Sequence, residues 1–398
     1  MATTLSREAV IIAAAGTSEP CLTLAHVNAT HSTTVAVLGG GQLGRMLGLA
    51  GISLGLRFRF LDPSARAPAG AVGTLVVGGL GDETSLGEVA TGAGIVTYEW
   101  EGVPAHAAQF LLDKGMIVHP GVRSLEVSQD RLTEKDTFRA LGIAGPKFAA
   151  VDTQADLAPA IETIGGYPAV LKTRRGGYDG KGQVVVREAA DLDGGWHAVG
   201  AGGAAPCVVE ELVAFDRELS VLAVRGRDGA IACWPLVENH HEGGILRVSR
   251  APAPGLDDVL QARGVDIATR LLTELDHVGV LAVELFDVDG ELLANEFAPR
   301  VHNSGHWTIE GAVTSQFENH LRAILGLPLG STDARGASMM VNCIEALPAR
   351  DAVLEIPGAH FHDYEKEPRA GRKLGHITLT GDEPGEIEHR LSALRAAL

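Results

Sequence analysis

Residues 34–118 alternate short apolar runs with stretches of helical character, and this alternation constrains the fold more than any other feature. Runs of strand length and character lie at 35–38, 57–61, 95–98 and 116–118. Three helical stretches separate them: one that follows Gly44 and ends at residue 54, one at 83–90 and one at 105–113. Such alternation is typical of a parallel sheet covered by helices, so we expect an α/β domain here.

A glycine-rich turn opens this segment. Gly39, Gly41 and Gly44 form a G-x-G-x-x-G pattern between the first strand and the first helix, and Asp62 ends the second strand. This arrangement is typical of Rossmann-like domains that bind a dinucleotide. The same glycines can serve only to pack a strand closely against a helix. A non-catalytic NAD-binding module therefore stays open as an alternative function.

The remainder of the chain is expected to have an α+β structure. Strands are predicted at 147–151, 168–172, 183–186, 207–213, 218–224 and 231–237, with helices at 131–141 and 256–276. A hairpin follows at 280–288 and 292–297, turning at Asp289-Gly290. The tail at 338–380 alternates short strands with turns. A length of 398 residues is consistent with two or three domains.

Charge and cysteine content limit the possible partners and compartment. The net charge of −17 argues against nucleic acid or an anionic membrane as the main partner. No apolar run reaches membrane-spanning length, and residues 1–31 fit a secretory signal poorly, so we expect a dispensable extension. We expect no zinc site or disulfide framework and a reducing cytoplasm, because the cysteines are far apart. They are Cys21, Cys207, Cys233 and Cys343.

A second glycine-rich loop, Gly176–Gly182, lies between two predicted strands. Its glycines would let backbone N–H groups approach phosphate oxygens, and Lys172 and Lys181 would supply positive charge. The alternative is a flexible hairpin tip. Lysine is scarce in this chain, so two lysines at one loop favour a site for nucleotide phosphates.

The predicted hairpin carries Glu284 on one arm and Glu296 on the other. A two-residue turn would pair Glu284 with Asn295 and place Glu296 on the opposite face of the sheet. A three-residue loop with Gly290 in the left-handed region would place both carboxylates on one face. Paired carboxylates beside phosphates would bind Mg²⁺, so we expect a metal site only in the three-residue register.

The stretch after this hairpin, residues 295–307, is unusually rich in chemically active side chains. It contains Glu296, Arg300, two histidines and two asparagines within thirteen positions. A connecting loop needs only small and turn-forming residues. Because these side chains follow a buried strand directly, the stretch predicts a functional site.

Three other polar segments are ambiguous from the residues alone. Glu210-Glu211 followed by Glu218 can be a solvated strand edge, and His240-His241 can be an exposed pair. The cluster at 366–373 holds four cations within eight residues and is either a solvated face or a pocket for a phosphate monoester.

Five motifs together are similar to those of the N5-carboxyaminoimidazole ribonucleotide synthase family, a branch of the ATP-grasp enzymes of purine biosynthesis. They are GGGQLGRM, DRLTEK, GGYDGKG, NEFAPRVHNSGHW and GRKLGH. The resemblance covers residues 34–380. It implies a Rossmann-like domain at 32–130, an ATP-grasp domain at 131–330 with a mobile lid at about 172–210, and a small β-rich domain at 331–398.

The resemblance also implies the reaction. The family uses ATP and bicarbonate to carboxylate the amine of 5-aminoimidazole ribonucleotide through carboxyphosphate. It implies two Mg²⁺ ions, with Mn²⁺ as a substitute, and a homodimer. Another ATP-grasp carboxylase or carboxylate–amine ligase with a different acceptor is the alternative.

Site roles follow from the resemblance motif by motif. The implied catalytic residues are Arg300, His302, Asn303 and Asp179. The implied nucleotide contacts are Arg131, Lys172, Gly176, Gly177, Tyr178, Asp179, Gly180, Lys181, Gly182, Glu210, Glu211, Leu212, Val213, Glu218, His241, Asn295 and Glu296. The implied substrate contacts are Gln42, Glu101, Lys366, Arg372 and Lys373, and the implied metal ligands are Glu284 and Glu296.

Overall fold

The structure, a computed structural model, describes residues 33–177, 180–200 and 206–397, and its N-terminal strands form a parallel sheet in the order β3-β2-β1-β4. The expected strand at 116–118 forms only a bridge between Val96 and Val118. Alternate residues of β1 face two different cores, so helices cover both faces. The elements are β1 (Thr34–Leu38), α1 (Gln42–Ile52), β2 (Arg57–Asp62), η1 (Pro68–Ala71), β3 (Thr74–Val77), α2 (Glu83–Ala90), β4 (Ile95–Tyr98) and α3 (Ala105–Asp113).

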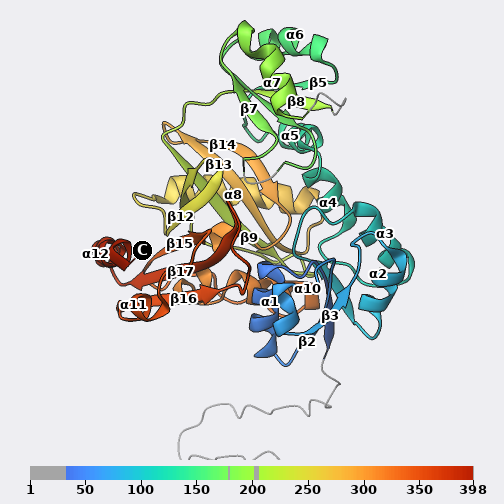
Figure 1. The fold of residues 1–398 in the computed structure, drawn as a ribbon, viewed down its shortest axis with the longest axis vertical. Helices are drawn as coiled ribbons and strands as arrows, with labels where there is room; N and C mark the ends of the chain where they lie inside the picture. Colours follow the sequence, from blue (N-terminus) through green and yellow to red (C-terminus); the bar gives the residue numbers. More distant parts are fainter. Residues whose placement is uncertain (1–32, 178–179, 201–205, 398) are drawn as a thin grey trace, which may run out of the picture. The chain divides into compact units, whose positions relative to one another are not determined.

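A smaller antiparallel sheet in the order β5-β8-β6-β7 follows, covered by α6 and α7 (green, top of Figure 1). The glycine-rich loop predicted to bind phosphates connects β6 to β7. The elements are α4 (Val122–Ser128), α5 (Arg131–Ala140), β5 (Phe148–Val151), α6 (Gln154–Ile164), β6 (Ala169–Thr173), β7 (Gln183–Val186), η2 (Ala189–Asp191), α7 (Leu192–Ala198) and β8 (Cys207–Glu211).

The largest sheet is antiparallel, with the order β14-β13-β9-β11-β12-β15-β17-β16 and β10 beside β9. The continuous strand expected at 231–237 is wrong. It divides into β10 and β11 at Trp234-Pro235, where the proline has no N–H for the ladder and the buried indole donates to the carbonyl of Thr314. The elements here are β9 (Arg217–Arg225), β10 (Ile231–Cys233), β11 (Val237–Glu242), β12 (Ile245–Ala251), α8 (Asp258–Glu274), β13 (Gly279–Val288) and β14 (Glu291–Ala298).

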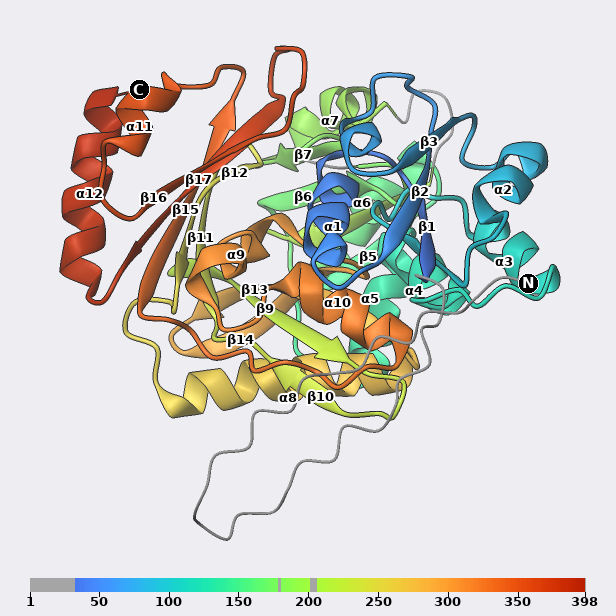
Figure 2. The same cartoon turned by 90° about the horizontal axis from the view of Figure 1, so that it is seen from below.

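The C-terminal strands continue this sheet, because β15 pairs with β12 (Figure 2). The expected combination of a parallel α/β sheet, further antiparallel sheets and a β-rich C-terminal part is confirmed. The remaining elements are η4 (Asn303–Gly305), α9 (Thr308–Gly311), α10 (Gln316–Leu325), β15 (Ala337–Ile344), α11 (Arg350–Leu354), β16 (Ala359–Asp363), β17 (Lys373–Gly381) and α12 (Pro384–Ala397).

One hydrophobic core joins the parallel sheet to the largest sheet. Val35 and Met46 of the first pack in the same cluster as Trp307, Phe317 and Leu321, which follow β14. This shared core fixes the end of β4 relative to the end of β14, where the candidate site lies. Among the helices that the structure describes, none combines the length and the apolar character needed to cross a membrane.

Candidate active site

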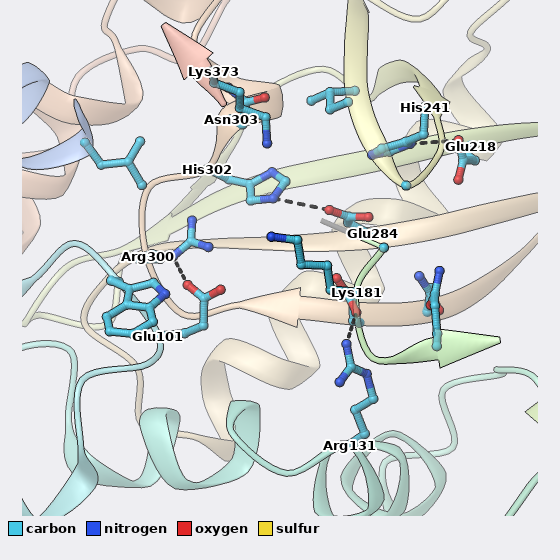
Figure 3. A pocket seen from close by; sticks show the side chains of 18 of the residues that line it. Glu101, Arg131, Lys181, Glu218, His241, Glu284, Arg300, His302, Asn303 and Lys373 are labelled. Atoms are coloured by element: carbon cyan, nitrogen blue, oxygen red, sulfur yellow. Dashed lines mark hydrogen bonds and ion pairs between the residues drawn. The ribbon is translucent and has the colours of Figure 1, made fainter. Parts of the chain in front are cut away.

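A cavity of about 540 Å³ lies where the ends of β4 and β14 meet the glycine-rich loop after β6 (Figure 3). Most of the predicted site residues line it, although they come from distant parts of the chain. The predicted residues that line it are Gln42, Glu101, Arg131, Lys172, Gly180, Lys181, Glu218, His241, Glu284, Asn295, Glu296, Arg300, His302, Asn303 and Lys373.

The hairpin β13–β14 combines features of the two registers that the sequence left open. Its turn is the two-residue Asp289-Gly290, because Val288 pairs with Glu291, so the three-residue loop is not formed. Both turn residues have positive φ, 52° and 80°, as in a type I′ turn. Glu284 nevertheless pairs with Glu296, because the register shifts by one residue beyond Leu285.

A β-bulge at Asn295 produces this shift. Leu285 pairs with Ala294 and Glu284 with Glu296, so Asn295 is the extra residue of β14. The bulge brings the two carboxylates opposite each other on the face that lines the cavity. It also gives Asn295 two contacts with lysines: its side-chain oxygen accepts from Lys172 Nζ at 3.4 Å and its carbonyl from Lys135 Nζ at 3.2 Å.

The two carboxylates suit a hard cation that also binds phosphate oxygens. No group of three metal-binding side chains occurs among the described residues. Mg²⁺ commonly takes only one or two carboxylates and completes its shell with phosphates and water. In this structure Oε2 of Glu296 lies 3.8 Å from Nη2 of Arg131, and Oε1 of Glu284 lies 3.2 Å from Nε2 of His302. Burial would raise the pKa of Glu284, but the His302 hydrogen bond and neighbouring cations outweigh it and lower that pKa to about 2.

Arg300 and Glu101, which both line the cavity, form an ion pair (Figure 3). The guanidinium also donates to the carbonyl of Val301 at 2.9 Å, which fixes its orientation. Burial would raise the pKa of Glu101, but Arg300 more than compensates and lowers it. The cavity therefore holds a charged arginine beside a charged carboxylate, a pair that can separate to bind a small oxyanion.

Buried charged side chains hold Lys172 of β6 in place. The carboxylate of Glu210 lies 3.0 Å from both Lys172 Nζ and Lys135 Nζ. Burial would raise the pKa of Glu210, but the two ammonium groups lower it. Glu210 does not line the cavity itself, so it contributes only by holding Lys172.

Another part of the cavity lining is a carboxylate hydrogen-bonded to an imidazole. Glu218 accepts a hydrogen bond from Nδ1 of His241 at 2.8 Å (Figure 3). Burial would lower the pKa of His241, but Glu218 raises it. The exposed-pair interpretation of the histidines is wrong for His241 and right for His240. Phe215 stacks on Phe286 at 4.7 Å beside this end and offers a flat apolar surface.

The first glycine-rich turn binds carboxylates of its own chain. Glu99 accepts the N–H groups of Gly41 and Gly44, both at 2.8 Å, and Asp62 accepts that of Gly40 at 2.9 Å. A Cβ on Gly41 would lie 2.7 Å from the Glu99 carboxylate. The N–H groups that would bind a pyrophosphate are therefore occupied, which argues against the NAD-binding module.

The basic C-terminal segment contacts the cavity in two ways, through its own Lys373 and through Gln42 of α1. Lys373 lines the cavity itself, whereas Lys366 donates a hydrogen bond to Gln42, which lines it. Arg372 donates to the carbonyl of Glu367 at 3.0 Å and lies outside the lining. Burial and the neighbouring cations lower the pKa of Lys366 to about 8, although Glu99 opposes the shift.

The structure leaves several predicted residues away from this cavity. Gly176 and Gly177 line an adjoining cavity of about 290 Å³, which shares Trp100, Glu101 and Arg131 with the first. Tyr178 and Asp179 lie outside the described residues. The others that do not line the larger cavity are Gly182, Glu210, Glu211, Leu212, Val213, Lys366 and Arg372.

Some lining residues were not predicted. Glu99 and Trp100 directly follow β4, and their place at the carboxyl end of a parallel strand is the signal that would have found them. Trp100 is 47% exposed, whereas Trp196, Trp234 and Trp307 are buried. The lining residues missed from the sequence are Leu43, Glu99, Trp100, Gln183, Phe215, Gly244 and Leu246.

Comparison with known families divides the chain into three consecutive matches. Residues 32–129 match the ribonucleotide synthetase preATP-grasp domain, residues 136–317 the ATP-grasp domain, and residues 338–390 the phosphoribosylaminoimidazole carboxylase C-terminal domain.

Known proteins resemble the chain over nearly its whole length. N5-carboxyaminoimidazole ribonucleotide synthase of Pseudomonas aeruginosa is 48% identical over 92% of this chain and 99% of the relative. The crystal structure of the synthetase from Thermus thermophilus has a TM-score of 0.87 at 53% identity, covering 92% of this chain and 98% of that one. The Aspergillus clavatus enzyme in complex with ADP and 5-aminoimidazole ribonucleotide has a TM-score of 0.84 at 31% identity, covering 92% and 99%. The chain belongs to the N5-carboxyaminoimidazole ribonucleotide synthase family of ATP-grasp enzymes, as its motifs predicted.

Proposed function

We propose that this chain uses ATP and bicarbonate to carboxylate the amine of 5-aminoimidazole ribonucleotide, forming N5-carboxyaminoimidazole ribonucleotide in purine biosynthesis. The Arg300–Glu101 pair is the observation that carries the proposal. It shares one cavity with the lysines predicted to bind the nucleotide and with a lysine predicted to bind the ribonucleotide phosphate. Lys172 and Lys373 both line this cavity. A small oxyanion at Arg300 would therefore meet both an activating nucleotide and an acceptor amine.

The nucleotide half would activate bicarbonate. A bicarbonate oxygen attacks the γ-phosphorus of ATP, which gives carboxyphosphate and ADP, and the charge that builds on the phosphoryl oxygens needs cations. Lys172 and Lys181 would bind the phosphates, with Glu218 and His241 at the ribose. Glu284 and Glu296 would hold Mg²⁺, which when bound neutralises phosphate charge.

The substrate half would complete the reaction. The amine attacks the carbon of carboxyphosphate or of the CO₂ it releases, forming a C–N bond and losing a proton, while phosphate leaves. Arg300, His302 and Asn303 line the cavity where these groups would meet, and exclusion of water there would protect the short-lived intermediate. Lys366, Arg372 and Lys373 would bind the ribonucleotide phosphate.

Three further properties expected from the family belong to the proposal. We propose the domain division at residues 130 and 330, a homodimer and a location in the cytoplasm. Sedimentation velocity would test the dimer, and a monomer at micromolar concentration would contradict it.

The test of the reaction is ADP formation with ATP, Mg²⁺ and bicarbonate, measured with and without 5-aminoimidazole ribonucleotide. We expect strong stimulation by the ribonucleotide, with one carbamate formed per ADP. Stimulation only by a different amine would instead support an ATP-grasp ligase with another acceptor.

The pKa of Lys366, about 8, predicts how the affinity for the ribonucleotide depends on pH. Only the ammonium form binds a phosphate strongly, so affinity is complete below this pKa and is lost as pH rises through it. We expect KM for the ribonucleotide to be nearly constant from pH 7 to 7.5 and to rise toward tenfold per unit above pH 8.5, roughly the limit for one proton. Lys366→Arg, whose charge persists, should flatten the profile. An equal rise in both proteins would exclude Lys366 as the cause.

Trp100 predicts an optical signal for substrate binding. Of the tryptophans in the chain it is the exposed one, and it lines both adjoining cavities. Titration with the ribonucleotide in the presence of ADP should quench tryptophan fluorescence, and Trp100→Phe should lose most of this quenching. Equal quenching in Trp100→Phe would place the substrate away from this residue.

A further inference from the structure

Asn342 of β15 forms a reciprocal amide pair with Asn303. Asn342 Nδ2 donates to Asn303 Oδ1 at 2.6 Å, and Asn303 Nδ2 donates back to Asn342 Oδ1 at 3.2 Å. Asn342 is 7% exposed and does not line the cavity, whereas Asn303 does. Within the described residues, these are the hydrogen bonds of the Asn303 side chain.

A third hydrogen bond fixes which way both amides point. Asn342 Nδ2 also donates to the main-chain carbonyl of Leu246 at 2.9 Å. A carbonyl accepts only, so the nitrogen of Asn342 must face it, and the oxygen of Asn342 must face Asn303. Asn303 is then obliged to present its nitrogen to that oxygen. The orientation of a cavity residue is thus set by a main-chain group of β12 through Asn342.

The consequence concerns which group Asn303 can offer to a ligand. Its oxygen and one N–H are engaged by Asn342, and the second N–H of its nitrogen is left for the cavity. An N–H donor suits an oxyanion such as bicarbonate or carboxyphosphate. If the amide were free to rotate by 180°, its oxygen would face that anion for part of the time and repel it.

We propose that Asn342 is a positioning residue for carboxylation, which holds Asn303 as a hydrogen-bond donor toward the oxyanion. This inference rests on the proposed function, and it makes a C-terminal strand part of the carboxylation site. β15 pairs with β17, and β17 begins at Lys373, which lines the same cavity. Two neighbouring strands therefore supply a phosphate contact and the orientation of Asn303.

The experiment replaces Asn342 by leucine, which has a similar size and forms no hydrogen bonds. We expect kcat with the ribonucleotide to fall about tenfold and the ratio of ADP to carbamate to rise above one, because a loosely held carboxyphosphate hydrolyses. KM for ATP should not change. Asn319→Leu is the matched control, since Asn319 is a buried asparagine whose side chain, within the described residues, hydrogen-bonds the main chain of Gly330 and does not line the cavity.

A double-mutant cycle separates positioning from stability. If Asn342 acts through Asn303, then Asn342→Leu should add little to the loss already caused by Asn303→Ala. Asn342→Asp, which keeps size and polarity but cannot donate, should uncouple the reaction as leucine does and serves if the leucine variant does not fold. Additive losses, or an uncoupling ratio in Asn319→Leu equal to that of Asn342→Leu, would overturn the proposal. An unaltered chain without ribonucleotide-stimulated activity would instead overturn the proposed function itself.

Discussion

Arg300→Met should lower kcat/KM for the carboxylation by about a thousandfold while the affinity for ADP stays within a factor of a few. Arg300 lines the cavity, is paired with Glu101 and is oriented by the carbonyl of Val301. A guanidinium can bind an oxyanion through two parallel N–H groups, which the lysines that line the same cavity cannot do. Initial rates with varied bicarbonate, together with ADP binding by calorimetry, measure the two quantities.

The main competing explanation is loss of stability, since Arg300→Met leaves the partly buried Glu101 carboxylate without its partner. The double variant Glu101→Gln/Arg300→Met removes both charges, so it should recover stability without recovering activity. Arg225→Met is a matched control, because Arg225 forms a 2.9 Å ion pair with Asp276 away from the cavity. If the double variant regained activity, Arg300 would matter for the fold rather than for chemistry.

Most of the parallel sheet was predictable because its signals are local. β1 and β4 are short apolar runs, and β2 alternates arginine with phenylalanine. β3 (Thr74–Val77) was missed from the sequence. The largest sheet was less predictable. The pairing of β15 with β12 joins residues about ninety positions apart, and no pattern within one segment shows it. The break between β10 and β11 falls at Pro235, a local signal that the prediction of one continuous strand overlooked.

The candidate site shows the same division between local and long-range information. The motifs named most lining residues, because their chemistry is concentrated in short segments such as 295–307. The register of β13 and β14 stayed open between two alternatives in the sequence. The turn at Asp289-Gly290 is a local feature, whereas the bulge at Asn295 places this residue against Lys135 and Lys172, more than a hundred positions earlier. Glu99 was missed because its partners, the N–H groups of the first glycine turn, lie more than fifty residues earlier.

The bulge gives the metal assignment a direct test. Glu296→Gln should lower kcat about a hundredfold and raise the Mg²⁺ concentration needed for half-maximal activity at least tenfold, because one of two facing carboxylates is lost. Glu284→Gln should act in the same direction. The affinity for MgADP, measured by calorimetry over a range of Mg²⁺ concentrations, should fall in both variants, and excess Mn²⁺ should restore part of the activity.

Glu291→Gln supplies the control, since Glu291 begins the same strand but is exposed and pairs with Arg263 instead of lining the cavity. A general loss of negative charge would affect all three variants, whereas a metal site affects only the facing pair. Glu296 also lies near Arg131, so a loss of activity that Mg²⁺ and Mn²⁺ leave unchanged would assign Glu296 to orienting that arginine. The two carboxylates would then owe their register to packing alone, and the metal would have to bind through phosphate oxygens without them.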